Sequence, residues 1–224
     1  MTGPRLTLHG YWRSSSSWRV RIGLHLKQLA FADRPVNLAD GEQRGDAHRA
    51  LSPLAQVPVL SVEEDGTTRH LVQSMAILEW LDERFPDPPL LPPDLAGRAR
   101  VRALAEHVNS GIQPLQNSLP LRMLREKLPG YEKEWARFHI ASGLAGLERA
   151  VGDGGAGRFC HGDAPGLADC YLVPQLGNAR RFVVDLAPYP RLLRIEAACA
   201  ALAPFQAAHP ERQPDLPPAD RRTP

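Results

Sequence analysis

The chain has few cysteines, and their arrangement suggests neither metal nor redox chemistry. Three cysteines, Cys160, Cys170 and Cys199, occur in 224 residues, and their spacing matches neither a zinc motif nor a redox pair. The eight histidines are scattered, without the paired spacing of a metal-binding helix. We therefore expect the cysteines to be buried as small apolar side chains, and we expect no metal site.

An excess of charge of one sign is also absent. Lysine and arginine total 27 against 25 aspartate and glutamate, a net charge of +2. This balance, without a basic stripe that aromatic residues interrupt, argues against nucleic acid as a partner. No apolar run approaches the ~20 residues of a membrane span, and the start, Met1–Arg5, lacks the apolar core of a secretory signal. We expect a cytoplasmic protein with no membrane partner.

Proline, in contrast, is abundant and divides the chain. Five of the 22 prolines fall within the ten residues Phe85–Asp94. Such a stretch cannot continue a helix and forms a stiff connector. We expect one domain over residues 1–85, a linker over 86–94 and a second domain over 95–224, whose proline-rich end frays after residue 212.

The two predicted domains differ in pattern. Before the linker, short strand-like runs alternate with segments of other periodicity, and 74–85 has apolar residues at helical spacing. This order predicts an α/β domain. The strand-like runs are 6–9, 31–37, 57–62 and 70–72. Beyond the linker helical patterns dominate and predict an all-α domain. The expected helices there are 95–119, 131–151, 167–180 and 190–202.

The pattern of residues 16–27 is ambiguous. Apolar residues from Trp18 to Leu26 alternate with polar ones, which is typical of a half-buried strand. A helix that is buried on two sides would also carry apolar residues around most of its circumference. The pattern is compatible with a strand and with a helix.

Four serines, Ser14–Ser17, follow the first expected strand and precede Trp-Arg-Val-Arg. Small hydroxyl groups and backbone N–H groups at such a turn can hold an anion. A second pair, Gln73 and Ser74, precedes the 74–85 segment. Ser74 is a good helix cap, and a helix start can instead hold the carboxylate of a ligand. Together these motifs predict a binding site for an anionic molecule.

The motifs resemble those of the cytosolic glutathione transferases, and within them the zeta class. The resemblance covers residues 6 to 215. It rests on Arg13–Ile22, Val57-Pro58, Gln73-Ser74, Gly111–Asn117, Ala168–Gln175, Phe182–Leu186, Pro188–Pro190 and His209–Asp215. It implies a thioredoxin-like N-terminal domain that binds glutathione, an all-helical C-terminal substrate domain, and a homodimer. It also implies that residues 16–27 form a helix.

The resemblance further implies roles for single residues. Three groups are assigned: Ser14, Ser15 and Ser16 stabilise the thiolate of glutathione; Gln43, Val57, a cis Pro58, Gln73 and Ser74 hold the tripeptide, with Gln113 and Asn117 as polar partners; Arg13 and Arg181 hold a dicarboxylate substrate. A plain surface role remains the alternative for the two arginines, for Gln43 and for the Gln113–Asn117 pair.

Position 16 departs from the class, since many zeta-class members have cysteine where this chain has Ser16. Isomerisation by this class uses the sulfur of glutathione. A serine at this position therefore need not abolish the reaction, although reactions that depend on the cysteine are lost.

The implied activity is glutathione-dependent cis–trans isomerisation of a maleyl β-keto diacid, such as maleylacetoacetate to fumarylacetoacetate. Maleylpyruvate isomerisation uses the same chemistry, and the motifs do not separate the two substrates. The motifs are also compatible with glutathione conjugation or α-halo-acid dehalogenation, and with a non-catalytic transferase-like module that binds partners. The intact serine run and Gln73-Ser74 argue against the binding module.

Overall fold

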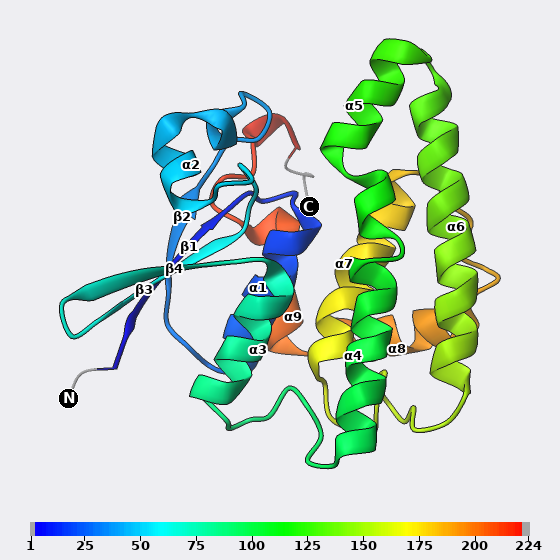
Figure 1. The fold of residues 1–224 in the computed structure, drawn as a ribbon. Helices are drawn as coiled ribbons and strands as arrows, with labels where there is room; N and C mark the ends of the chain where they lie inside the picture. The colour runs from blue at the N-terminus through cyan, green and yellow to red at the C-terminus, as the bar shows by residue number, and fades with distance from the viewer. Residues whose placement is uncertain (1–2, 221–224) are drawn as a thin grey trace. The chain divides into compact units, whose positions relative to one another are not determined.

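The structure is a computed structural model that describes residues 3–220 and divides them into two compact units. One unit is Leu90–Leu202, and the other combines residues 3–89 with 203–220. Figure 1 labels the elements of both units. The sequence predicts that the end of the chain belongs to the helical domain, but it packs with the first unit instead.

The first unit contains a four-stranded sheet, with the strands in the order β2-β1-β3-β4. They are β1 (Arg5–Gly10), β2 (Ala32–Pro35), β3 (Val59–Glu64) and β4 (Thr67–Val72). β2 runs parallel to β1, and β3 runs antiparallel to both of its neighbours. β4 starts earlier than expected because Asp65 and Gly66, with φ of 49° and 73°, form a two-residue hairpin turn.

Helices α1 (Ser15–Leu26) and α3 (Ser74–Arg84) pack against each other in the same unit (Figure 1). The ambiguous segment is therefore a helix, as the resemblance implied. Its burial extends around most of the circumference, since α1 also contacts the short α9 (Ala203–Ala207). The remaining elements are η1 (Glu42–Arg44), α2 (Asp46–Leu51), η3 (Pro210–Arg212) and η4 (Pro218–Asp220). The mixed sheet and its helices confirm the expected α/β, thioredoxin-like class.

A buried lysine fixes the far end of α1. The ammonium group of Lys27 donates to Asp82 Oδ1 at 2.6 Å and to the carbonyls of Phe85 and Pro88, each at 2.7 Å. The lysine side chain is fully buried, so these oxygens replace its water shell. The end of α1 is thereby joined to the end of α3 and to the proline-rich segment.

The second unit is all-helical, as expected. Its helices are α4 (Leu95–Asn109), α5 (Ser118–Lys127), α6 (Tyr131–Gly152), α7 (Leu167–Arg181) and α8 (Pro190–Ala200). Helix α7 is buried along most of its length, and α4 and α8 pack on it (Figure 1). The expected helix 95–119 was wrong in extent. It ends at Asn109, η2 (Gln113–Gln116) follows, and a separate α5 begins, because Gly111 and Pro114 interrupt helical hydrogen bonding.

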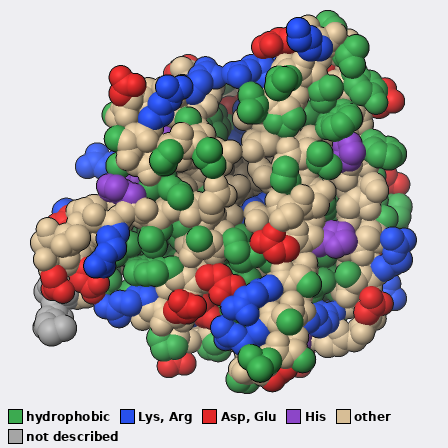
Figure 2. Space-filling view, viewed as in Figure 1, with side chains coloured by type: hydrophobic (Ala, Val, Ile, Leu, Met, Phe, Trp, Pro, Cys, Tyr) green, Lys and Arg blue, Asp and Glu red, His purple; other side chains and the backbone are tan. Residues whose placement is uncertain are grey.

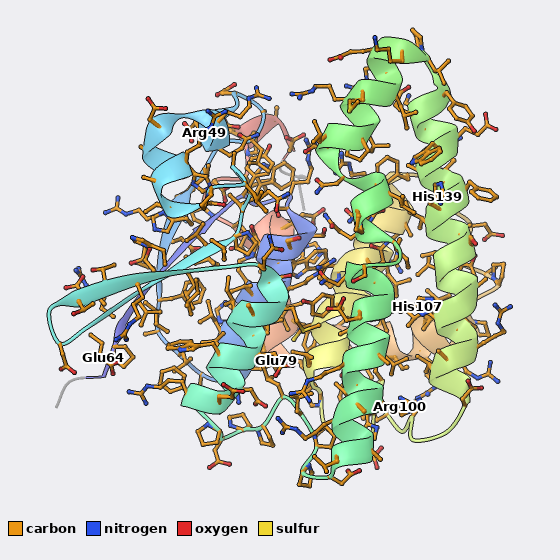
Figure 3. All side chains as sticks on the ribbon, in the orientation of Figure 1. Arg49, Glu64, Glu79, Arg100, His107 and His139 are labelled. Carbon is orange, nitrogen blue, oxygen red and sulfur yellow. The ribbon has the colours of Figure 1, made fainter. Side chains whose placement is uncertain are left out.

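Arg100, labelled in Figure 3, anchors the end of α6 from α4. Its guanidinium donates to the carbonyls of Ala150 at 3.3 Å and of Val151 and Cys160, both at 3.1 Å. The last carbonyls of a helix lack partners within the helix, so a cation at this end stabilises it.

Exposed apolar side chains gather over α5 and the first half of α6 (Figure 2). They are Leu119, Met123, Leu128, Tyr131 and Phe138. Across residues 3–220, no helix combines the length and the apolarity that a bilayer crossing requires.

Candidate active site

The serine run begins helix α1. Ser14 is the N-cap, and its Oγ accepts a hydrogen bond from the amide of Ser17 at 3.2 Å. Ser15 and Ser16 follow in the first turn, and all three are half-buried. No acidic residue lies in this turn. The positive end of the α1 dipole therefore meets three hydroxyl groups, an arrangement that favours a bound anion.

Ser17 supports the turn from inside the unit. It is fully buried, and its Oγ accepts from the amide of Tyr11 at 3.4 Å. The amide of Ser14 in turn donates to the carbonyl of Tyr11 at 3.0 Å. The loop between β1 and α1 thus closes on itself, which fixes the position of Ser14.

Arg21 holds the same loop. Its guanidinium donates to the carbonyls of Tyr11 at 3.4 Å, Trp12 at 2.9 Å and Ala208 at 3.1 Å. Burial lowers the pKa of Arg21 to about 10 against the opposing effect of two nearby carboxylates. The group is still charged near neutral pH, so its three bonds are charge-assisted and connect the loop to the C-terminal segment.

A small apolar cluster lies beside this loop. Tyr11, Trp12 and Leu216 form its buried part, and Leu38 and Val57 pack against it. The loop before the serines and Val57, the residue before Pro58, therefore pack against the same apolar cluster. Leu216 from the C-terminal segment belongs to this cluster.

The peptide bond between Val57 and Pro58 is cis, which confirms what the resemblance implied. β3 begins at Val59, so Val57 precedes the strand ladder. The residue before Val57 is Gln56, whose carbonyl contacts His48 Nε2 at 2.9 Å. Extended backbone beside a sheet can pair with a peptide-like ligand as an added strand would.

The second polar pair lies at the start of α3. Gln73 is the N-cap with φ of 69° and ψ of 119°, a conformation that non-glycine residues rarely adopt. Its side chain donates to Gln56 Oε1 at 3.3 Å and forms no capping bond to the described part of α3. Ser74 is buried, and its Oγ accepts from Arg19 at 3.2 Å. Arg19 thus connects the middle of α1 to the start of α3.

Gln43 lies in η1 and is half-buried. Its Oε1 is buried and has no hydrogen-bond partner among residues 3–220. A buried amide oxygen without a partner is uncommon in folded proteins. This feature agrees with a role for Gln43 in contact with a ligand.

The two arginines expected at the substrate are both exposed. Arg13 lies over the ring of its neighbour Trp12, with 5.5 Å between the guanidinium carbon and the ring centre. Arg181, the last residue of α7, lies over Phe182 at 5.3 Å in the same way. Stacking keeps each guanidinium at the surface, where it can meet an acidic molecule.

Gln113 and Asn117 do not share one helix, contrary to expectation. Gln113 begins η2, while Asn117 is the N-cap of α5 and its Oδ1 accepts from the amide of Ser118 at 2.7 Å. The structure brings the sequence-predicted residues together in two groups. The first unit holds Arg13, Ser14–Ser16, Gln43, Val57, Pro58, Gln73 and Ser74, and the second holds Gln113, Asn117 and Arg181.

Sequence reasoning missed three residues that support the site: Arg19, Arg21 and Asp215. The two arginines lie in a segment whose apolar residues surround a helix, so charges there need buried partners. That signal was present, but it required the helix to be known. Asp215 gave no signal, since a proline-rich charged end is typical of a frayed terminus.

Comparison with known proteins agrees with this arrangement. Residues 13–84 match the family model of the glutathione S-transferase N-terminal domain, and residues 129–211 match that of the C-terminal domain. A protein of Drosophila melanogaster described as probable maleylacetoacetate isomerase 2 is 46% identical, with 94% of this chain and 90% of that protein covered.

Two solved structures are similar over almost the whole chain. Maleylacetoacetate isomerase from Anaeromyxobacter dehalogenans, solved with glutathione in its active site, is 70% identical, with a TM-score of 0.91 and coverage of 97% and 100%. A bacterial maleylpyruvate isomerase, described as a zeta-class glutathione transferase, is 43% identical, with a TM-score of 0.88 and coverage of 93% and 99%. The chain therefore belongs to the glutathione S-transferase family and, within it, to the zeta class.

Proposed function

We propose that this protein is an enzyme that isomerises a maleyl β-keto diacid from cis to trans with glutathione as cofactor, and that maleylacetoacetate is its substrate. The observation that carries the proposal is the start of α1, where Ser14–Ser16 meet the positive end of a helix dipole. The isomerase from Anaeromyxobacter dehalogenans, 70% identical, was solved with glutathione in its active site. The same protein was also solved with dicarboxyethyl glutathione and citrate.

The described residues fit glutathione in four places. The first turn of α1 offers hydroxyl groups to an anionic sulfur. Val57 and the cis Pro58 offer backbone outside the ladder for the peptide-like middle of the molecule. Gln73 and Ser74, at the start of α3, offer polar groups to the γ-glutamyl end, and Gln43 with its buried amide oxygen lies on the glycyl side.

The serines are sufficient to ionise a thiol at neutral pH. A thiol with a pKa of ~8.5 is only a few per cent ionised near pH 7. Lowering that pKa by about two units requires about 2.7 kcal/mol in favour of the charged form. One hydroxyl donor to a charged acceptor contributes about 1.5–3 kcal/mol, and a helix N-terminus adds about 0.3–1 kcal/mol. No lysine or metal is required for this step.

The chemistry supplied by bound glutathione is reversible addition of its thiolate to the conjugated double bond, which leaves a single bond free to rotate before elimination. Ser14–Ser16 hold the sulfur charged before addition and after elimination, so the cycle consumes no net proton. Arg13 and Arg181 bind carboxylates and stabilise the negative charge that develops on the β-keto group. Gln113 and Asn117 are proposed as polar partners of the bound molecules.

Maleylpyruvate is the second candidate substrate, because the zeta-class maleylpyruvate isomerase is 43% identical over the same length. Glutathione conjugation and α-halo-acid dehalogenation remain secondary activities that the same thiolate allows. Homodimeric assembly, cytoplasmic location and a role in aromatic amino acid catabolism belong to this proposal, and sedimentation of the purified protein tests the first of them.

Purified protein with glutathione should convert maleylacetoacetate to the trans isomer, and the ratio of kcat/KM for maleylacetoacetate and maleylpyruvate identifies the preferred substrate. Ser14→Ala should lower kcat by about 10- to 100-fold, the loss of one hydrogen bond to a charged acceptor. Ser142→Ala, an exposed serine of α6, is the control and should match the wild type. Absence of turnover with both substrates, or full activity of Ser14→Ala, contradicts the proposal.

A further inference from the structure

The short segment η2 carries at its two ends the polar residues proposed as partners of bound glutathione. Gln113 begins η2, Asn117 follows it, and both side chains are half-buried. A 3₁₀ helix of four residues does not hold its own conformation, because so few hydrogen bonds do not offset the cost of ordering the chain. The position of η2 must therefore come from its contacts with other helices.

A pair of buried glutamines joins η2 to α7. Gln116, the last residue of η2, is 6% exposed, and Gln175 in α7 is fully buried. Gln116 Nε2 donates to Gln175 Oε1 at 2.6 Å, and Gln175 Nε2 donates back to Gln116 Oε1 at 3.4 Å. Each amide thus supplies one donor and one acceptor to the other. Such reciprocal pairing fixes both the separation and the orientation of the two amides, so it holds η2 in one position against α7.

Helix α6 holds the same segment from another direction. The indole nitrogen of Trp135 donates to the carbonyl of Leu115 at 2.9 Å. The indole ring contacts the ring of His139, which Figure 3 labels on α6, with 4.3 Å between the ring centres. Further along α6, a Cβ atom at Gly143 would collide with the side chain of the fully buried Ile112, so the helix and the start of η2 approach closely. The backbone of η2 is therefore fixed by α6 and α7 together.

We propose that Gln175 is a positioning residue for glutathione binding, and that by pairing with Gln116 it holds η2 where the polar residues at its two ends bind the tripeptide. The proposal rests on the proposed function, in which those two residues are partners of glutathione. Gln175 acts through Gln116 and touches no reacting atom. Its effect is therefore on the binding of glutathione and not on the addition and elimination steps.

The test measures turnover and stability of variants of the full-length protein. Gln175→Met and Gln116→Met should each raise the KM for glutathione about three- to tenfold, the net value of one hydrogen bond. The kcat at saturating glutathione should stay close to that of the wild type, because only a binding interaction is lost. Each single variant also leaves one buried amide unpaired, so the urea concentration at the midpoint of unfolding should fall.

The double variant, Gln116→Met with Gln175→Met, separates positioning from folding. It replaces both amides by apolar side chains of similar size, so no buried amide is left unpaired and the urea midpoint should return close to that of the wild type. Methionine is flexible and lacks directional pairing, so the KM for glutathione should stay raised. Recovery of the KM together with the midpoint would mean that the pair has only a structural role, and would overturn the inference.

Two variants that each remove one hydrogen bond supply an independent probe and its matched control. Trp135→Phe removes the bond from α6 to the carbonyl of Leu115, so it should raise the KM for glutathione as Gln175→Met does. Tyr189→Phe removes the bond from Tyr189 Oη to the carbonyl of Ala141, at 2.9 Å, in which η2 takes no part. It should lower the urea midpoint and leave the KM unchanged. If the single glutamine variants do not fold, the double variant and Trp135→Phe carry the test.

The outcomes distinguish this inference from the proposed function. A wild-type KM for glutathione in Gln175→Met, or an equal rise of the KM in Tyr189→Phe, would overturn the inference alone. A wild-type protein that turns over neither diacid in the presence of glutathione would overturn the proposed function, and the inference with it. A raised KM in the glutamine variants and in Trp135→Phe, with kcat almost unchanged, supports both.

Discussion

The carboxylate of Asp215 accepts a hydrogen bond from the backbone amide of Trp12 at 2.8 Å, across 203 residues of sequence. The bond reaches the loop that leads from β1 to the serines. The next residue, Leu216, packs against Trp12 in the apolar cluster, and Gln213 fixes the segment by donating to the carbonyls of Ala207 and His209 at 3.0 and 2.8 Å. The C-terminal segment is therefore part of the support of the proposed glutathione site.

We expect Asp215→Ala to weaken the site through this loop. The amide of Trp12 would lose its acceptor, a change that costs about 1–3 kcal/mol when the group stays buried. The KM for glutathione should rise several-fold. In urea titrations, the free energy of unfolding should fall by about 1–3 kcal/mol. Asp220→Ala, an exposed aspartate in the same segment, is the control. Equal glutathione KM values for Asp215→Ala and the wild type would contradict this account.

Gly23 allows α1 and α3 to approach closely. A Cβ atom at this position would collide with Cδ2 of Leu78, which is fully buried. We expect Gly23→Ala to lower the free energy of unfolding by about 1–3 kcal/mol, because the gain in helix propensity is smaller than the overpacking cost. Chemical denaturation measures this change. In a Leu78→Ala background, the same Gly23→Ala change should cost less free energy of unfolding than in the wild type, because the colliding atom is gone. A single Gly23→Ala variant as stable as the wild type would exclude the collision.

His9 should make stability depend on pH on the acid side of neutrality. It lies on β1, its Nε2 contacts Ser61 Oγ at 2.9 Å, and the same oxygen contacts His70 Nδ1 at 2.9 Å. Burial lowers the pKa of His9 below 6.5, and charges on His48, His70 and Arg34 lower it further.

At pH values below 6.5, the unfolded chain therefore takes up a proton that the folded chain does not. The free energy of unfolding thus falls as the pH is lowered and is fully retained at higher pH. Between about pH 7.5 and about pH 5.5, His9→Gln should lose less free energy of unfolding than the wild type. His139→Gln, in the helical unit, is the control. An identical pH dependence in His9→Gln and the wild type would show that His9 does not carry the effect.

The helix at residues 74–85 was predictable because only one of its faces is buried. The 74–85 segment carries Ile77, Leu78 and Leu81 at helical spacing, and all three are fully buried in α3. Helix α1 was not predictable from its own pattern. It is buried around most of its circumference, so apolar periodicity no longer distinguishes a helix from a strand.

The helix boundaries predicted for the second half of the chain were wrong for local reasons. The expected 95–119 helix continued through Gly111 and Pro114, two residues that favour an end. No helix was expected at α5, whose first turn contains Pro120. Proline is tolerated there, since the first turn of a helix has no acceptor for its N–H groups.

By itself the sequence determined the α/β and all-helical halves and the proline-rich connector, because each depends on local backbone preferences and on spacing along the chain. Tertiary structure alone decided that Asp215 and Leu216 support the loop before Ser14 and that Arg19 contacts Ser74. These contacts join residues from 55 to 203 positions apart. Hydrogen bonds and packing at such separations depend on how elements fold back on one another, which no local pattern encodes.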